Sequence, residues 1–437
     1  MRVIKDDNIS FLAAAFGLKQ RFHAAFTPMI CFDLADPSLI VPEEEMWKTA
    51  KEILPVGAVL DSGMPKAKGE FLVAGNCCAP GGKAVTGQNV TVWVGGITKS
   101  ISVFGNRYWA QRDGGWRISD PVPFKEMSLD NVNAFGGAGH ATNPSGIGMG
   151  EITREGKILR PLPNLENPQR LITSPNDAPE PATMLPLAVN NPRRARFAGT
   201  YDDAWLKKRW PWYPDDLDSR FFNCAPEEQW NHDYFTGSEV IEVSGMHPDY
   251  PVQRASLPRL RMRMFVTKRK SGGAEKLPDE QFIEIETRID TIWLFPTQQR
   301  AVMLFRGLVD TCDDEMSDVA SVFTVAEPLD TPPKSAEHYL EEQHRRVSRT
   351  AGIDKAPIAE AQEQIAAFLN SIPDMKRDLD IRMAAGLGKA PVATTSTADK
   401  FAAAGTLLSS FAPLIAQGES MADSFRAKYG QIGRAHV

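Results

Sequence analysis

Phe282-Ile-Glu-Ile-Glu-Thr-Arg-Ile-Asp290 alternates apolar and polar side chains without a break. Because successive side chains of a β-strand point to opposite faces of a sheet, this period of two predicts a half-buried strand. Two apolar runs follow, Thr291-Ile-Trp-Leu-Phe295 and Ala301-Val-Met-Leu-Phe305, and Pro296-Thr-Gln-Gln299 between them is typical of a hairpin connection. This part of the chain therefore predicts antiparallel β-structure.

The same signals recur on the N-terminal side of this stretch. Val90-Thr-Val-Trp-Val94, Ile101-Ser-Val-Phe104, Glu239-Val-Ile-Glu-Val243 and Leu260–Val266 all predict strands, and 47–54 predicts a short helix. Residues 131–200 are rich in Gly, Pro and Asn, which predicts long ordered loops around the β core. We expect residues 1–310 to form a mainly β domain of antiparallel sheets, sandwich- or barrel-like, with long Gly/Pro loops.

The character of the sequence changes after residue 310. Residues 311–334 are predicted to be a linker, and 335–430 a helical C-terminal appendage, truncated in this sequence, with helices over 335–349, 357–369, 379–387 and 399–411. The last residues, Gln431-Ile-Gly-Arg-Ala-His-Val437, resemble the translation of a sequencing-adaptor read-through. We therefore expect 431–437 to be an assembly artefact without functional weight.

Composition narrows the classes of partner. The chain has 437 residues, a net charge of −6 and a pI near 5.8, which disfavours nucleic-acid and anionic-membrane partners. It contains neither an apolar signal core nor an uncharged apolar run of about 18 residues. The five cysteines are scattered and form no C-x-x-C pair: Cys31, Cys77, Cys78, Cys224 and Cys312. Reduced thiols and a cytoplasmic location are the expectation.

Motifs that would carry catalysis are missing from the sequence. No Walker A loop, nucleophile elbow, H-E-x-x-H helix or EF-hand loop occurs. The glycine run 136–139 lacks the Lys-Ser/Thr of a phosphate loop, and the seven histidines do not cluster. We expect no metal, no cofactor and no enzymatic activity.

An acidic and aromatic segment, Trp210-Pro-Trp-Tyr-Pro-Asp-Asp-Leu-Asp-Ser-Arg220, is the sharpest local feature. One interpretation is a buried aromatic anchor, and another is a protein-binding surface, since Trp and Tyr bury much area at little entropic cost. A third is a carbohydrate- or peptidoglycan-active hydrolase that uses Asp215, Asp216 or Asp218 beside Trp210 or Trp212. The residues predicted to bind a partner are Trp205, Trp210, Trp212, Tyr213, Phe221, Phe222 and Phe135.

Five motifs in order carry a resemblance over about residues 1–310. They are Phe104-Gly-Asn-Arg-Tyr-Trp109, Ala134-Phe-Gly-Gly137, Asn143-Pro-x-Gly-x-Gly148, Leu162-Pro-Asn-Leu-Glu-Asn-Pro168 and Trp210-Pro-x-x-Pro-Asp-Asp-Leu-Asp-x-Arg-Phe-Phe-Asn223, the last closed by Ala225-Pro226. Together they resemble the family called domain of unknown function 2169, whose members accompany type VI secretion genes.

The resemblance implies an accessory role. It suggests an adaptor or chaperone that binds a type VI secretion effector and helps to load it onto the spike protein or the PAAR-tip protein. It implies no catalytic residue. Some relatives carry pentapeptide repeats where this chain has its helical region, so the partner of that region is not predicted. A chain that is itself a secreted effector component is the remaining alternative.

Overall fold

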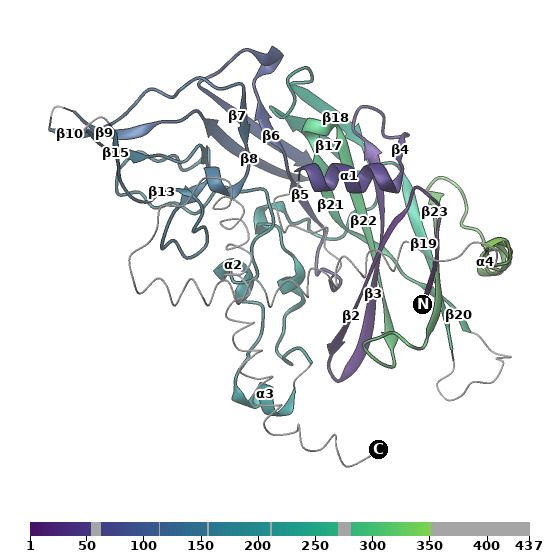
Figure 1. Ribbon diagram of the computed structural model, residues 1–437. Helices are drawn as coiled ribbons and strands as arrows, with labels where there is room; N and C mark the ends of the chain where they lie inside the picture. Colours follow the sequence, from purple (N-terminus) through teal and green to yellow (C-terminus); the bar gives the residue numbers. More distant parts are fainter. Residues whose placement is uncertain (54–62, 113, 155–156, 210–211, 270–280, 351–437) are drawn as a thin grey trace. The chain divides into compact units, whose positions relative to one another are not determined.

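The computed structural model describes residues 1–53, 63–112, 114–154, 157–209, 212–269 and 281–350. The chain forms two compact units, and the described residues up to Pro333 belong to the first, while 334–350 belong to the second. The fold is mainly β, with several sheets and few helices, which confirms the predicted class (Figure 1).

A six-stranded sheet organises the first unit. Its strands are, in spatial order, β2 (Ser10–Leu18), β3 (Arg21–Asp33), β22 (Arg300–Thr311), β21 (Arg288–Phe295) and β5 (Glu70–Val73), with the short β4 (Ile40–Val41) paired to β3. All neighbours are antiparallel except β5, which runs parallel to β21. The predicted hairpin after residue 295 is confirmed, because a single 3-10 turn, η5 (Pro296–Gln298), joins β21 to β22.

Two further sheets complete the main β-structure. A five-stranded sheet has the order β16 (Leu165–Glu166), β8 (Ile97–Phe104), β7 (Gly87–Val94), β17 (Val240–Ser244) and β18 (Val252–Ser256). A four-stranded sheet has the order β1 (Arg2–Ile4), β23 (Val319–Pro328), β19 (Leu260–Lys268) and β20 (Gln281–Ile285), in which β1 is parallel to β23.

The first unit also contains smaller sheets, short helices and 3-10 turns. They are the sheet β10 (Gly115–Ile118), β9 (Tyr108–Arg112), β15 (Lys157–Pro161) and β14 (Ile152–Arg154), the pairs β6 (Asn76–Cys78) with β11 (Glu126–Ser128) and β12 (Phe135–Gly136) with β13 (Ile147–Gly148), and the helices α2 (Pro192–Ala195) and α3 (Asp203–Lys208) with the 3-10 turns η1 (Pro80–Gly82), η2 (Asn131–Asn133), η3 (Ser219–Phe222) and η4 (Glu227–Gln229).

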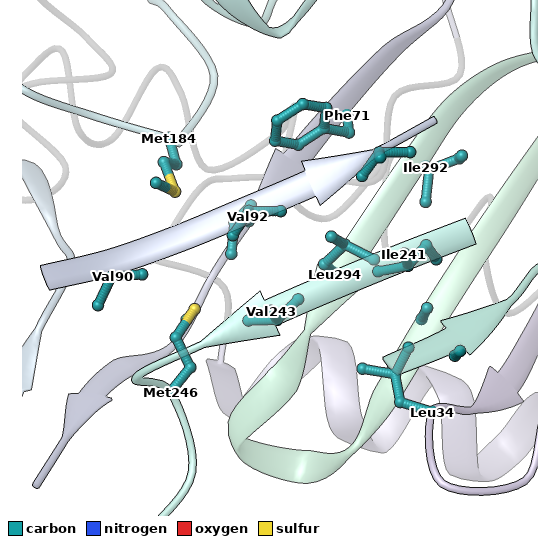
Figure 2. Close-up of a cluster of buried hydrophobic side chains, with 14 of the residues drawn as sticks. Leu34, Phe71, Val90, Val92, Met184, Ile241, Val243, Met246, Ile292 and Leu294 are labelled. Carbon is teal, nitrogen blue, oxygen red and sulfur yellow. The ribbon is translucent and has the colours of Figure 1, made fainter. Parts of the chain in front are cut away.

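One face of the six-stranded sheet packs on the five-stranded sheet and forms the main core. Phe71 of β5 and Leu294 of β21 are fully buried in one cluster with Val92 of β7 and Ile241 of β17 (Figure 2). Each such side chain contributes about 1.5–3 kcal/mol when it leaves water. The two sheets therefore pack face to face as a β-sandwich.

The same face continues beyond this core to the four-stranded sheet. Phe26 of β3 and Val309 of β22 lie in a second cluster with Val266 and Val322. A Cβ at Gly307 would lie 2.3 Å from Cε of Met264, so the glycine is what lets the two sheets approach at this point. The long strands β3 and β22 thus pack against both the five-stranded and the four-stranded sheet.

The opposite face of the six-stranded sheet is covered by a helix and by irregular chain. Helix α1 (Glu43–Ile53), expected over 47–54, places Met46 against this face. Leu185, Cys224 and Ala225 from the irregular segments cover the rest, beside Trp293 of β21. This arrangement brings the chain around residue 224 onto the sheet.

Two expectations need correction. The alternating stretch 282–290 is not one strand, because it breaks at Glu286 and Thr287 between β20 and β21, which belong to different sheets. Thr287 fixes the corner by donating a hydrogen bond from Oγ1 to the Met262 carbonyl, at 2.6 Å. Residues 311–334 are not a simple linker, since β23 lies between β1 and β19 in a sheet.

The second unit contains α4 (Ala336–Thr350), which matches the helix expected over 335–349. The expected helices 357–369, 379–387 and 399–411, and the segment 431–437, lie outside the described residues. Among the described residues, no helix is both long and apolar enough to cross a bilayer.

Candidate functional site

The aromatic segment, defined here as residues 200–230 without 210 and 211, begins at helix α3. The Asp202 side chain caps this helix by accepting the backbone N–H of Trp205 at 2.7 Å. The Trp205 ring is buried, lies edge-on to Tyr201 with 4.7 Å between ring centroids, and donates from Nε1 to the Trp212 carbonyl at 2.9 Å. The buried Trp205 ring therefore links the start of the segment, at Tyr201, to Trp212.

Trp212 and Tyr213 fasten the segment to the β2–β3 hairpin. The Trp212 ring lies against Phe22, with centroids 4.4 Å apart, and a Cβ at Gly17 would lie 2.2 Å from its Cε3. The Tyr213 N–H donates to the Gly17 carbonyl at 3.0 Å. Since any side chain at position 17 would displace the ring, glycine is what allows this docking.

The end of the segment forms a second aromatic group. Phe222 is buried, and its ring meets Tyr213 and Phe221 edge-on at 5.7 Å and 5.5 Å. Arg194 lies over the Phe221 ring at 5.1 Å and donates from Nε to the Phe221 carbonyl at 2.8 Å. The segment is thus held by contacts along its whole described length.

The seven residues predicted to bind a partner fall into three groups. Trp205, Phe222 and Phe135 are buried, Trp212, Tyr213 and Phe221 are half-buried, and Trp210 lies outside the described residues. Phe135 belongs to a different cluster, with Trp109, Leu162 and Ile172. The structure therefore joins the residues of 205–222 with one another, and places Phe135 in a cluster of its own.

The three acidic residues considered above for a hydrolase, Asp215, Asp216 and Asp218, each have their own partner. Asp215 pairs with Arg209, and Asp216 accepts from Thr200 N at 3.0 Å and from Thr200 Oγ1 at 2.7 Å. Asp218 caps η3 through the Arg220 N–H at 2.9 Å. These are the contacts of turn and capping residues.

Hydrogen bonds also lower the pKa of two of these carboxylates, Asp216 and Asp218. The Thr200 hydroxyl and N–H lower the pKa of Asp216, and the Arg220 guanidinium lowers the pKa of Asp218. The general acid of a glycosidase needs a raised pKa, so the shifts at these two residues have the opposite direction.

A buried polar centre lies where the segment ends. We call Lys66, Glu70, Asn223 and Cys224 the lysine centre. Lys66 Nζ donates to Glu70 Oε1 at 2.5 Å, and both side chains are fully buried, at 0% exposure. The Glu70 carboxylate also accepts from the N–H groups of Cys224 and Ala225, at 3.2 and 3.1 Å, and from Asn223 Nδ2 at 3.0 Å. Such full pairing is what a buried charge requires.

Cys224 contributes a thiol to the same centre. Its Sγ lies 3.2 Å from Glu70 Oε1 and 3.6 Å from Lys66 Nζ. An amine, a thiol and a carboxylate are therefore in mutual contact inside the protein.

Asn223 connects the lysine centre to the chain before β5. Its Oδ1 accepts the N–H groups of Ala67 and Lys68 at 3.0 and 3.2 Å, and its Nδ2 donates to the Lys68 carbonyl at 2.9 Å. A second buried ion pair adjoins it, since Asp290 Oδ2 accepts from Arg306 Nε at 2.6 Å and from the Lys66 N–H at 3.3 Å. The aromatic segment is thereby anchored to the six-stranded sheet.

Sequence reasoning did not identify Lys66 or Glu70. Asn223 lies 153 positions from Glu70, so no local spacing links the two residues. The available signals were a charged residue directly before the apolar run Phe71-Leu-Val73 and the motif that ends at Asn223. Neither signal indicates which residues contact Glu70 in the folded protein.

Of the other four cysteines, three are buried and one is exposed. Burial raises the pKa of Cys31 and Cys77 to about 12 and the pKa of Cys78 to about 11, whereas Cys312 is exposed. Within the described ranges, no group of three or more His, Cys, Asp or Glu side chains is placed to hold a metal ion.

Comparisons with known proteins give one relationship. Residues 19–306 match a protein family described as "Uncharacterized protein conserved in bacteria (DUF2169)", which is more than half of the chain. No curated protein and no solved structure matches the chain. The matched region contains the aromatic segment, the lysine centre and most of the six- and five-stranded sheets.

Proposed function

The chain belongs to this DUF2169 family, and from that premise we propose that it is a non-enzymatic adaptor or chaperone. In this proposal it binds a type VI secretion effector in the cytoplasm and helps to load it onto the spike or PAAR-tip protein. The motif resemblance set out above supports the proposal, and the family match over residues 19–306 supports the family assignment on which it rests.

One structural observation carries the proposal further. The aromatic segment is mostly irregular chain that is fixed at two points, where Tyr213 meets Gly17 of the β2–β3 hairpin and where Asn223 meets Glu70 of the lysine centre. Loops held by a rigid scaffold commonly carry binding surfaces. Trp212, Tyr213 and Phe221 are half-buried and so remain partly accessible to solvent, and we propose these three as contacts.

The outer side of α3 offers a test that spares the core. Lys207 and Lys208 are exposed, whereas Trp205 on the same helix is buried. We expect the double variant Lys207→Glu, Lys208→Glu to weaken capture of the partner at least tenfold while the unfolding curve stays unchanged. Lys83→Glu changes another exposed lysine, directly after η1, and this variant should bind as the unchanged protein does.

The measurement is a pull-down followed by titration with the effector, spike and tip proteins encoded beside the gene. Capture of one of them by the unchanged protein supports the proposal. Capture of none at micromolar concentration would refute it. Equal loss of binding in the Lys83→Glu control would show that net charge, and not this surface, governs capture.

A further inference from the structure

The lysine centre brings together groups that can react with one another. Lys66 Nζ lies 3.6 Å from Cys224 Sγ, and Glu70 Oε1 contacts both atoms, at 2.5 and 3.2 Å. The amine and the thiol come from residues 158 positions apart in the sequence. A hydroxyl could replace the thiol as a donor to Glu70, so the ion pair itself does not require sulfur.

We propose that hydrogen peroxide converts Lys66 and Cys224 into a reversible covalent cross-link. In the first step the Cys224 thiol reduces one peroxide molecule, which leaves a sulfenic acid and releases one water. In the second step the Lys66 ammonium first gives a proton to Glu70, and the resulting amine attacks the sulfur, so that a nitrogen–sulfur bond forms while the sulfur–oxygen bond breaks.

Glu70 can transfer the proton that the second step moves from the nitrogen to the departing oxygen. The attacking nitrogen loses one proton, and the departing hydroxyl takes up one proton and leaves as the second water. Glu70 Oε1 is within hydrogen-bonding distance of both Nζ and Sγ, so its carboxylate can carry this proton. The product is a sulfenamide that has lost two hydrogens, and one peroxide is consumed. An added dithiol reverses it by reducing the nitrogen–sulfur bond.

The other cysteines do not offer this chemistry. The Cys77 sulfur lies 3.4 Å from the Gln88 side-chain amide, and the Cys78 sulfur lies 3.7 Å from the Asn76 carbonyl, and neither partner is an amine. Cys312 is exposed, but Asp313 and Ser317 are the groups that contact its sulfur, and neither is an amine. Peroxide is small and uncharged like water, which reaches polar groups inside proteins.

The cross-link would act on the aromatic segment. Lys66 precedes β5, and Cys224 follows η3, so the bond ties the end of the segment to the edge of the six-stranded sheet. Closing a loop of this length removes conformational freedom from the unfolded chain. Oxidation is therefore expected to raise the unfolding temperature by several degrees.

The experiment treats the full chain with hydrogen peroxide, digests it, and identifies linked peptides by mass spectrometry. We expect a Lys66–Cys224 pair lighter by two hydrogens, about 2 Da, than the sum of its peptides, and lost after dithiothreitol. Cys312→Ser should retain the link and the rise in unfolding temperature. Cys224→Ser, which replaces sulfur by oxygen at nearly the same size, should abolish both.

Several outcomes would overturn the proposal. They are Cys224 found only as sulfinic or sulfonic acid, a disulfide between Cys224 and Cys31, or an unmodified Cys224 when Cys312 is fully oxidised. A linked pair that carries an additional oxygen would overturn the direct nitrogen–sulfur bond. Because the unchanged protein is measured, the result does not depend on whether a variant folds, and it is independent of partner binding.

Discussion

At the scale of single residues, Glu70 is the side chain on which the buried charges depend. Its carboxylate accepts hydrogen bonds at both oxygens, from Lys66 at one and from Asn223 and Ala225 at the other. A glutamine has only one accepting oxygen and no charge. We expect Glu70→Gln to lower the free energy of unfolding by about 3–5 kcal/mol, because it leaves a buried ammonium without its counter-ion.

Urea unfolding measures this loss, and an exposed pair provides the control. Arg259 and Asp330 form an ion pair on the surface, with both side chains more than half exposed. Asp330→Asn should leave the unfolding midpoint unchanged. A Glu70→Gln variant as stable as the unchanged protein would show that Lys66 is neutral in the folded state.

Glu228 predicts a dependence on pH. Burial raises the pKa of Glu228, but the hydrogen bond from Arg193 and the ammonium of Lys99 outweigh burial and lower the pKa to about 2. A lowered carboxyl pKa stabilises the folded protein above the unfolded value of 4.5, and this contribution disappears as the pH falls towards 2. The stabilisation is below about 1 kcal/mol, since the side chain is about half exposed.

The corresponding test compares Glu228→Gln with the unchanged protein by urea unfolding at several pH values. We expect the variant to be less stable near neutral pH, and the difference to shrink between about pH 4.5 and pH 3. A difference that stays constant through this range would mean that Glu228 keeps an ordinary pKa.

At the scale of elements, the docking of the aromatic segment on the β2–β3 hairpin predicts a structural role for its rings. Trp212 packs against Phe22 over the space left by Gly17, and Tyr213 meets Phe222. Removing both rings by Trp212→Ala and Tyr213→Ala should lower the free energy of unfolding by about 2–4 kcal/mol, less than for fully buried rings.

Chemical denaturation monitored by fluorescence and circular dichroism gives this value. Tyr250 is the matched control, because its side chain is half exposed in the loop before β18. Tyr250→Ala should change the stability only slightly. If the double variant were as stable as the control variant, the two rings would contribute to the surface alone.

Elements also show what the sequence could and could not predict. Helix α1 and the turn after Phe295 follow from local signals, namely acidic residues after Pro42 and Pro296 between two apolar runs. The break at Glu286 and Thr287 does not, because period-two alternation reports which side is apolar and not which sheet a strand joins. The lysine centre could not be predicted either, because its residues are far apart in the sequence and meet only in the folded chain.

At the scale of the whole molecule, the β-rich unit extends beyond the region that matches the family. The family match covers 19–306, yet β1 and β23 lie outside it and pair with each other in the four-stranded sheet. β23 also pairs with β19, and Val322 and Phe323 of β23 are fully buried. The unit that folds is therefore longer than the region shared with the family.

This difference leads to a prediction about truncated chains. A chain that ends at Pro333 keeps β23 and should unfold cooperatively in urea, whereas one that ends at Asp310 loses it. In the shorter chain, β1 loses its pairing strand, and the cluster around Phe26 and Val266 loses its cover. We expect the chain of 310 residues to be insoluble or to lack a cooperative transition, because exposed strand edges favour aggregation.

The chain that ends at Pro333 serves as the control for the shorter chain. Near-ultraviolet circular dichroism reports whether the core aromatic residues are ordered in each. A cooperative transition in the 310-residue chain would mean that the sandwich of the six- and five-stranded sheets is stable alone. The four-stranded sheet would then be an attachment to the fold, whereas the burial of Phe26 and Val309 beneath it indicates a part of the core.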